Sequence, residues 1–378
     1  MVSGLVSKQA GVHRAAQPPR QDVASRKARK SGMLCYSAGP VFVLRGQAMH
    51  EMPVNETPAN QHGADGVLTS ETMLEVQPQP ERFAREPDGR LSIQARAKLN
   101  LGLRVFPARP DGFHDIESWF VAVNWHDTLY VSAAEELRIT ITGRSEGVPT
   151  DPTKNLIGKA ALKLAEHAGI AARAHLELHK VLPPGGGLGG GSSDAAATLV
   201  VLNELWGLHW DDRKLKAIAA ELGSDVPFFV HGRASLCTGR GEVMTAMRSY
   251  HTLFAVLILP PFGCGTKDVY QAFDAGHRHD PALPKTNWCE FASSDAARLN
   301  GLLLNDLELA AFAVEPRLRA LRDRAAAAIG QNVHMSGSGS TLFTLASSAP
   351  ASADIQNKLN AALNGDAAVV PVRILRHR

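Results

Sequence analysis

The sequence has few cysteines, little net charge and no long apolar run. Four cysteines occur in 378 residues, far apart and with no C-x-x-C spacing. This pattern argues against a disulfide framework or a cysteine zinc site and is typical of thiols in a reducing compartment. No apolar run approaches the roughly 18 residues of a membrane-spanning helix. A net charge of +3 is too small by itself to indicate nucleic-acid binding, so we expect neither a membrane nor a nucleic acid as partner.

Residues 1–88 lack hydrophobic periodicity and are rich in Ala, Gln, Pro, Ser and Gly. The first thirty carry seven Lys or Arg and one acid, Asp22, a composition that suits an organelle transit peptide. The simpler interpretation is a disordered extension or a start codon assigned too early, because four further methionines occur in this region. We expect the simpler alternative and a cytoplasmic protein; a plastid stroma is the location if the segment is a transit peptide.

Glycine, in contrast, is concentrated in one stretch, residues 183–199, which reads PPGGGLGGGSSDAAATL. Residues without a side chain let the backbone turn sharply and approach a ligand closely. Ser192, Ser193 and Asp194 are of the types that begin helices, and an apolar helix can follow over residues 195–206. A glycine loop that leads into a helix presents free N–H groups and the positive end of a dipole, and so predicts phosphate binding. A flexible linker would rarely follow Pro-Pro and run straight into so apolar a helix.

Two common phosphate loops fit this stretch badly. A dinucleotide fold needs a strand after the helix and an acidic residue about twenty residues beyond the glycines. Asp211 and Asp212 fall near that distance but open another amphipathic helix, residues 212–222. A P-loop needs Gly-Lys followed by Ser or Thr, and no lysine occurs between Pro183 and Trp210.

A third pattern fits well: P-x-G-G-G-L-G-G-G-S-S-[DN]-A-A resembles the central motif of the GHMP kinases, which are small-molecule kinases. The doubled GGG and the SSDAA tail are most similar to the branch whose substrate is a cytidylyl-methylerythritol. The resemblance covers roughly residues 91–378 in five segments in the right order. It implies an α+β fold: a domain like ribosomal protein S5 domain 2 over residues 89–249, a ferredoxin-like domain over residues 250–378, and the site between them.

The resemblance implies that ATP is the phosphoryl donor, with Mg²⁺ bridging its phosphates. No residue is assigned as a metal ligand. Asn155 could be simply the N-cap of a helix over residues 155–168, whereas in the family this asparagine contacts adenine; both roles can coexist. The remaining nucleotide contacts are assigned to Pro183, Gly185, Gly186, Gly187, Leu188, Gly189, Gly190, Gly191, Ser192 and Ser193.

The catalytic pair is predicted from two separate segments. Residues 91–105 alternate apolar and polar positions and predict a half-buried strand, with Lys98 and Asn100 on one face. On spacing alone a solvated lysine is the simpler interpretation, but A-K-L-N-L resembles the family's opening and implies that both side chains lie in the active site. Asp225 could be a mere N-cap before Pro227; G-[SA]-D-[VI]-P-x-F resembles the family's segment with the catalytic aspartate. A carboxylate held by a cation such as Lys98 can accept the proton of an attacking alcohol.

A site for the base is predicted from two further segments. The turn R-x-D-G-[FY]-H at residues 109–114 resembles the family's cytosine site, with Phe113 as stacking platform and His114 as hydrogen-bonding partner. Without the resemblance, a Phe-His pair is more often core packing. Thr266 and Tyr270 have the i, i+4 spacing of one helical face; a looser resemblance implies a substrate-contacting hydroxyl and a second ring over the cytosine.

Other segments are predicted to build the frame. Strands are expected over residues 129–132, 137–142, 174–182 and 253–259, and a strand and turn over residues 237–241 near the domain edge. Residues 304–308 resemble a structural family segment. The sequence SGSGS at residues 336–340 is the family's third motif, a tight turn between strand-like segments at 331–335 and 342–345 that packs beside the glycine loop.

Three alternative functions compete with a cytidylyl-methylerythritol kinase. Another GHMP kinase, acting on homoserine or a mevalonate-type alcohol, would not need Phe113, His114 and Tyr270. A non-catalytic nucleotide-binding or S5-like RNA-binding module is opposed by the small net charge and by the presence of Lys98 and Asp225. A Rossmann dehydrogenase would bind NAD.

Overall fold

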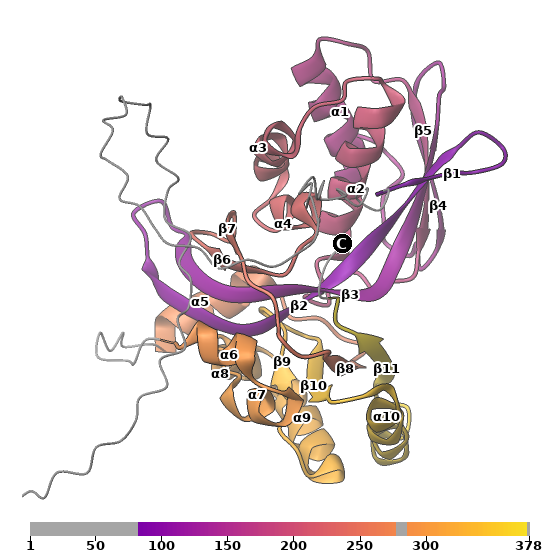
Figure 1. The fold of residues 1–378 in the computed structure, drawn as a ribbon. Coiled ribbons are helices and arrows are strands. Elements are labelled where there is room, and N and C mark those ends of the chain that lie inside the picture. The colour runs from indigo at the N-terminus through magenta and orange to yellow at the C-terminus, as the bar shows by residue number, and fades with distance from the viewer. Residues whose placement is uncertain (1–81, 277–285, 376–378) are drawn as a thin grey trace, which may run out of the picture. The chain divides into compact units, whose positions relative to one another are not determined.

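The computed structural model describes residues 82–276 and 286–375, which all belong to one compact unit of the chain (Figure 1). The predicted extension therefore lies largely outside the described residues, as does Cys35. Residues 82–88 are described, and Ala84–Arg85 forms the short strand β1 against β2, so the folded part includes residues before Asp88. The predicted division between residues 249 and 250 falls between two strands and stays a prediction.

The first sheet has seven strands, with the order β1-β2-β3-β5-β4 and with β6 and β7 continuing from β3. Neighbouring strands are antiparallel except β4 and β5. This arrangement excludes the parallel sheet of a Rossmann fold. The strands after β1 are β2 (Leu91–Ala108), β3 (His114–Ser132), β4 (Leu137–Gly143), β5 (Ala174–Lys180), β6 (Ser235–Thr238) and β7 (Val243–Ala246).

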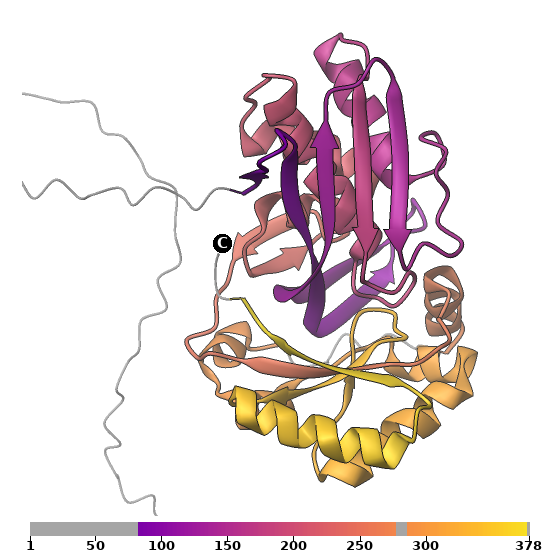
Figure 2. The same ribbon diagram turned by 90° about the vertical axis from the view of Figure 1, so that its right-hand side faces the viewer.

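Helices α1 to α4 lie on one face of this sheet, where α1 and α2 contact its strands (Figure 2). Asn155 caps α1 through a bond from Ile157 N–H, and Gly169 ends the helix in the left-handed region, as predicted. α2 begins at Gly190, so the expectation that Ser192, Ser193 or Asp194 begins it is wrong; Gly189 precedes it at φ +69° without a side-chain cap. The helices are α1 (Leu156–Ala168), α2 (Gly190–Leu205), α3 (Asp212–Leu222) and α4 (Val226–His231).

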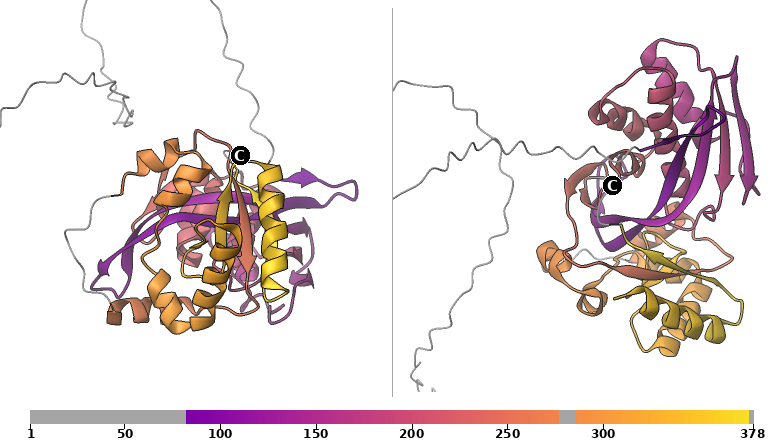
Figure 3. Two further views of the ribbon diagram at one scale, coloured as in Figure 1. Left: turned by 90° about the horizontal axis from the view of Figure 1, so that it is seen from below. Right: turned by 45° about the vertical axis from the view of Figure 1, so that its right-hand side comes forward.

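The second sheet is antiparallel with the order β11-β8-β10-β9, and α10 packs alongside its strands (Figure 3). This order, with a helical segment after the first and third strands, is the predicted ferredoxin-like arrangement. No helix of the described residues is long and apolar enough to cross a membrane. The elements are β8 (Phe254–Leu259), α5 (Thr266–Gly276), α6 (Trp288–Ser293), α7 (Ala296–Leu302), α8 (Glu308–Val314), α9 (Pro316–Ile329), β9 (His334–Met335), β10 (Leu342–Ala346), α10 (Ala349–Leu363) and β11 (Ala368–Arg373).

The two sheets share a core that runs through the middle of β2. Leu99 and Leu101 pack in one apolar cluster with Leu257 of β8 and Phe343 of β10. From Ala97 to Leu103 every residue of β2 is buried, so the prediction of a half-buried strand is wrong for this stretch. The second sheet covers the apolar face, while the glycine loop covers the polar face. Burial on both sides explains how a lysine on this strand is withdrawn from solvent.

Candidate functional site

A cavity of about 870 Å³ lies among β2, the β2–β3 turn, the glycine loop and α5. That volume is within the range of small-molecule sites. Residues from all five segments singled out in the sequence line it together. They are Lys98, Asn100, Phe113, His114, Pro183, Gly185, Gly186, Gly187, Leu188, Gly189, Gly190, Gly191, Ser192, Asp225, Thr266 and Tyr270. Asn155 and Ser193 are the two predicted site residues that do not line it.

Lys98 and Asp225 meet in this cavity. Lys98 Nζ lies 3.4 Å from Asp225 Oδ2, and the lysine side chain is almost fully buried. Lys98 Nζ also donates to Asn100 Oδ1 at 2.5 Å and lies 4.6 Å from the centre of the Phe120 ring. Asp225 precedes α4 but makes no side-chain capping bond. Its carboxylate therefore faces the cavity and Lys98 rather than the end of the helix.

Asn100 connects this pair to the SGSGS turn. Its side-chain N–H donates to Ser118 Oγ at 2.9 Å, and Ser118 Oγ donates to the carbonyl of Gly102. The backbone N–H of Asn100 donates to Ser336 Oγ at 3.2 Å. With Lys98 on its carbonyl oxygen, the Asn100 amide has partners at both ends. This chain of bonds fixes the rotamer in which Lys98 faces Asp225.

The glycine loop is packed against the SGSGS turn, as predicted. A methyl group on Gly187, which has φ +73°, would lie 2.7 Å from Gly339 O and 2.8 Å from Ser336 O. Thr341 donates to the carbonyl of Gly186 through both its N–H and its hydroxyl. Leu188 is buried, and its carbonyl accepts the N–H of Lys98 at 2.9 Å. The loop is thus tied at its centre to both the second sheet and β2.

A buried charged cluster beneath the loop was not predicted from the sequence. Lys180, the last residue of β5, places Nζ 2.5 Å from Asp127 Oδ2 and 2.8 Å from Asp194 Oδ2. Asp127 Oδ1 accepts the N–H groups of Val181 and Leu182. Burial, together with the neighbouring charge of Asp127, raises the pKa of Asp194 to about 7, although the Lys180 ammonium acts in the opposite direction. The cluster connects β5, which leads into the glycine loop, to the first turns of α2. Its one local sign in the sequence is a lysine, Lys180, shortly before Pro183 and Pro184.

The residues predicted to hold the base, Phe113, His114 and Tyr270, line the same cavity. The rings of His114 and Tyr270 have centroids 5.2 Å apart. His114 Nδ1 lies 2.7 Å from the carbonyl oxygen of Phe106, which can only accept, so Nδ1 is the donor. His114 Nε2 lies 3.3 Å from Asp274 Oδ1. Phe113 is 47% exposed. Aromatic rings beside an imidazole suit a planar heterocycle. Both ring nitrogens of His114 already face protein oxygens, so its predicted contact with the base stays a prediction.

Thr266 and Ser338 join α5 to the SGSGS turn. Their hydroxyl oxygens are 2.9 Å apart, and both residues line the cavity. Thr266 begins α5, and Tyr270 lies one turn further along the same helix. The predicted i, i+4 relation therefore holds, and both side chains reach the same cavity.

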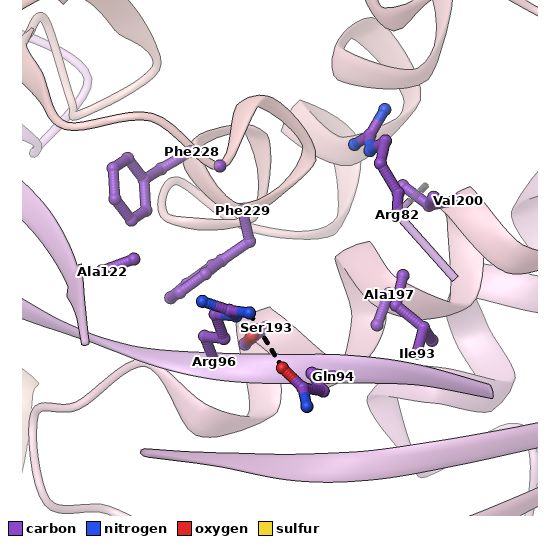
Figure 4. Close-up of a pocket in the computed structure, with 11 residues that line it drawn as sticks. Arg82, Ile93, Gln94, Arg96, Ala122, Ser193, Ala197, Val200, Phe228 and Phe229 are labelled. Carbon is purple, nitrogen blue, oxygen red and sulfur yellow. Dashed lines mark hydrogen bonds between the residues drawn. The ribbon is translucent and has the colours of Figure 1, made fainter. Parts of the chain in front are cut away.

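Ser193 lies in a second, much smaller pocket of about 20 Å³ (Figure 4). It is buried next to Arg96, whose guanidinium donates to Gln94 Oε1 at 2.8 Å beside Phe229. The volume is enough for about one water molecule. Ser193 does not line the large cavity, so its predicted contact with the nucleotide stays a prediction.

Asn155 is occupied by its own chain. Its side-chain oxygen accepts Ile157 N–H at 3.0 Å, and its side-chain nitrogen donates to the carbonyl of Pro149 at 2.6 Å. Its neighbour Leu156 lines the cavity, whereas Asn155 does not. The structure thus supports the capping role, and the adenine contact stays a prediction.

The fold and the cavity define a kinase of the GHMP class. The sequence profile described as GHMP kinases N terminal domain matches residues 155–233, and that of GHMP kinases C terminal matches residues 290–365. The homoserine kinase from Cytophaga hutchinsonii has the same fold, with a TM-score of 0.62 at 20% identity over 79% of this chain and 98% of that one.

Curated relatives narrow the class to one family. The 4-diphosphocytidyl-2-C-methyl-D-erythritol kinase of Nocardia farcinica is 39% identical over 292 residues, which are 76% of this chain and 92% of the relative. The kinase of that name from Mycobacterium tuberculosis is 37% identical over 73% of this chain and 88% of the relative. A crystal structure of 4-(cytidine 5'-diphospho)-2C-methyl-D-erythritol kinase has a TM-score of 0.62 at 32% identity and covers 75% of this chain and 98% of its own. The chain belongs to the 4-diphosphocytidyl-2-C-methyl-D-erythritol kinase family.

Proposed function

We propose that this kinase transfers the γ-phosphoryl group of ATP to the 2-hydroxyl of 4-diphosphocytidyl-2-C-methyl-D-erythritol, a step of non-mevalonate isoprenoid biosynthesis. The observation that carries the proposal is that the Lys98–Asp225 pair and the His114–Tyr270 rings line one cavity with the glycine loop. A phosphate loop, a carboxylate–ammonium pair and a base site are the three parts that this substrate pair requires.

Asp225 accepts the proton of the 2-hydroxyl as its oxygen attacks the γ-phosphorus. The new P–O bond forms while the bond to the β-phosphate oxygen breaks, and ADP leaves. Lys98 holds the Asp225 carboxylate at 3.4 Å and offsets negative charge on the transferred group. Phosphoryl transfer depends mainly on positioning and electrostatic stabilisation, so these groups suffice.

The glycine loop, residues 183–191, and Ser192 hold the phosphates of ATP. Backbone N–H groups at the start of α2 face a position where the helix dipole favours negative charge. The side chain of Leu188 is buried, so the loop presents mainly backbone to the cavity. Its bonds to Thr341 and Lys98 keep it in this shape before ATP arrives.

Mg²⁺ fits this site as a companion of the nucleotide. The described residues hold no group of three His, Cys, Asp or Glu side chains that could bind a metal ion by themselves. Mg²⁺ is commonly held by one or two carboxylates together with substrate phosphates, and Asp225 would supply such a carboxylate in the cavity that the glycine loop lines. When bound, the ion neutralises charge on the phosphates.

The test is a comparison of alcohols. The full-length protein is incubated with Mg-ATP and, separately, with the cytidylyl-methylerythritol substrate, homoserine and mevalonate, and ADP release is followed. Release with the cytidylyl compound alone is expected. Release with homoserine or mevalonate alone would keep the GHMP kinase class but refute the base site, and ATP binding without turnover on any alcohol would refute the proposed reaction.

A further inference from the structure

The turn between β6 and β7 carries an arginine into the cavity. Gly239 and Gly241, on either side of Arg240, have φ values of +66° and +113°, which only glycine adopts without strain. The carbonyl of Gly239 accepts Ile116 N–H at 2.7 Å, and Arg240 N–H donates to Glu242 Oε2 at 2.7 Å. The turn is therefore fixed to β3 only two residues beyond His114.

The Arg240 guanidinium stacks on the base platform. Its central carbon lies 3.7 Å from the centre of the Phe113 ring. In the part of the chain that the structure describes, no carboxylate forms an ion pair with it. Arg109, in the β2–β3 hairpin that carries Phe113, instead pairs with Asp111 and Asp115. Because the N–H donors of its guanidinium form a planar fork, Arg240 remains able to bind an anion.

Arg240 also lies on the path from the base site to the transfer site. A methyl group on Gly241 would lie 3.9 Å from Asp225 Oδ1, while the side chain of Arg240 reaches Phe113. Two other ammonium or guanidinium groups line the cavity, those of Lys98 and Lys267. Lys98 is paired with Asp225. Arg240 stacks on Phe113 and adjoins the glycine that lies near Asp225, so its guanidinium is placed between the two sites.

We propose that Arg240 binds the diphosphate of the cytidylyl substrate while its plane supports Phe113. This inference rests on the proposed function, because it is that substrate whose diphosphate links a base to the reacting hydroxyl. A diphosphate that connects a base at Phe113 to a hydroxyl at Asp225 passes the Arg240 guanidinium. A guanidinium can donate two parallel N–H bonds to two oxygens of a phosphate. Arg240 is thus a specificity-determining residue that favours diphosphate-linked nucleosides over nucleosides.

The test is a calorimetric titration of the intact protein with CDP and with cytidine, which needs no turnover. Arg240→Gln is expected to weaken CDP binding about 10- to 100-fold and cytidine binding less than about threefold, with Arg240→Lys recovering part of the CDP affinity. Arg233→Gln removes an exposed arginine before β6, outside the cavity, and is expected to change neither.

The outcomes separate this inference from the proposed function. Equal losses for CDP and cytidine would mean that Arg240 acts only through Phe113 and would overturn the diphosphate assignment. Unchanged CDP binding in Arg240→Gln would do the same while leaving the base site intact. A wild-type protein that binds neither compound would overturn the base site and this inference together.

Discussion

Asp194 and Lys180 are held together beneath the glycine loop, with Asp194 Oδ2 2.8 Å from Lys180 Nζ. Asp127 Oδ2 contacts the same ammonium at 2.5 Å, so two buried carboxylates share one positive charge. The pKa of Asp194 rises to about 7 from 3.8 because burial disfavours its charge. A proton is therefore retained by the cluster at pH values where the unfolded chain has lost it.

The sign of the resulting pH dependence is determined by this raised pKa. Between about pH 4 and pH 7 the folded state binds more protons than the unfolded state, so the contribution of Asp194 to stability falls as the pH rises. Asp194→Asn removes this titrating group. The decrease in unfolding free energy from pH 5 to pH 8 should therefore be about 2–3 kcal/mol smaller in the variant than in the wild-type protein. Urea unfolding at both pH values measures this. Asp366→Asn, at an exposed aspartate paired with Arg324, is the control; an equal effect in both variants would refute the account.

The catalytic pair is tested by Asp225→Asn and Lys98→Met. Each should lower kcat by about 10²- to 10⁴-fold, because proton transfer and charge compensation are lost. Circular dichroism should show a folded protein in both cases. Asp212→Asn changes an acidic residue at the start of α3, ion-paired with Arg82 outside the cavity, and should retain normal turnover. Near-normal kcat in Asp225→Asn or in Lys98→Met would remove that residue from catalysis.

The shape of the glycine loop is tested by Gly187→Ala. Its positive φ and the two carbonyls within 2.8 Å of an added methyl group should lower the free energy of unfolding by about 2–5 kcal/mol. Gly191→Ala, in the first turn of α2, is the control, because a methyl group there meets no atom within 4 Å. Its stability should stay unchanged or rise by up to about 1 kcal/mol. Equal destabilisation in urea unfolding would contradict the packing of the loop.

The base platform is tested by Phe113→Ala. Loss of one stacking ring should raise KM for the cytidylyl substrate by about 10- to 100-fold and leave KM for ATP unchanged. Phe106→Ala alters another exposed ring of the same hairpin, 40% exposed against 47% for Phe113, that does not line the cavity. If both variants raise KM alike, the platform is not at Phe113.

Most of the site could be predicted from the sequence because its residues lie in short, ordered motifs. Local patterns also predicted α1 with its caps and the strands on either side of the SGSGS turn. The burial of Lys98 could not be predicted, because alternation along one strand does not reveal that a second sheet and a loop cover its two faces. The Lys180 cluster joins residues 53 and 14 positions apart, and no local pattern predicts such a pairing.

The start of α2 was placed too late for a related reason. Ser192, Ser193 and Asp194 have side chains that favour capping, yet the left-handed turn at Gly189 lets the helix begin before them. Asp194 is then turned inward to Lys180 rather than to the helix end. Tertiary contacts outweighed the local preference at these positions.

The central claim is that a phosphomonoester forms on the intact cytidylyl substrate. Phosphorus-31 NMR of a reaction with Mg-ATP and the cytidylyl-methylerythritol tests it directly. We predict one new phosphomonoester signal that appears in step with ADP, while the two diphosphate signals of the substrate persist. Inorganic phosphate or CMP in place of that signal would show hydrolysis rather than transfer and would contradict the assignment of this cavity.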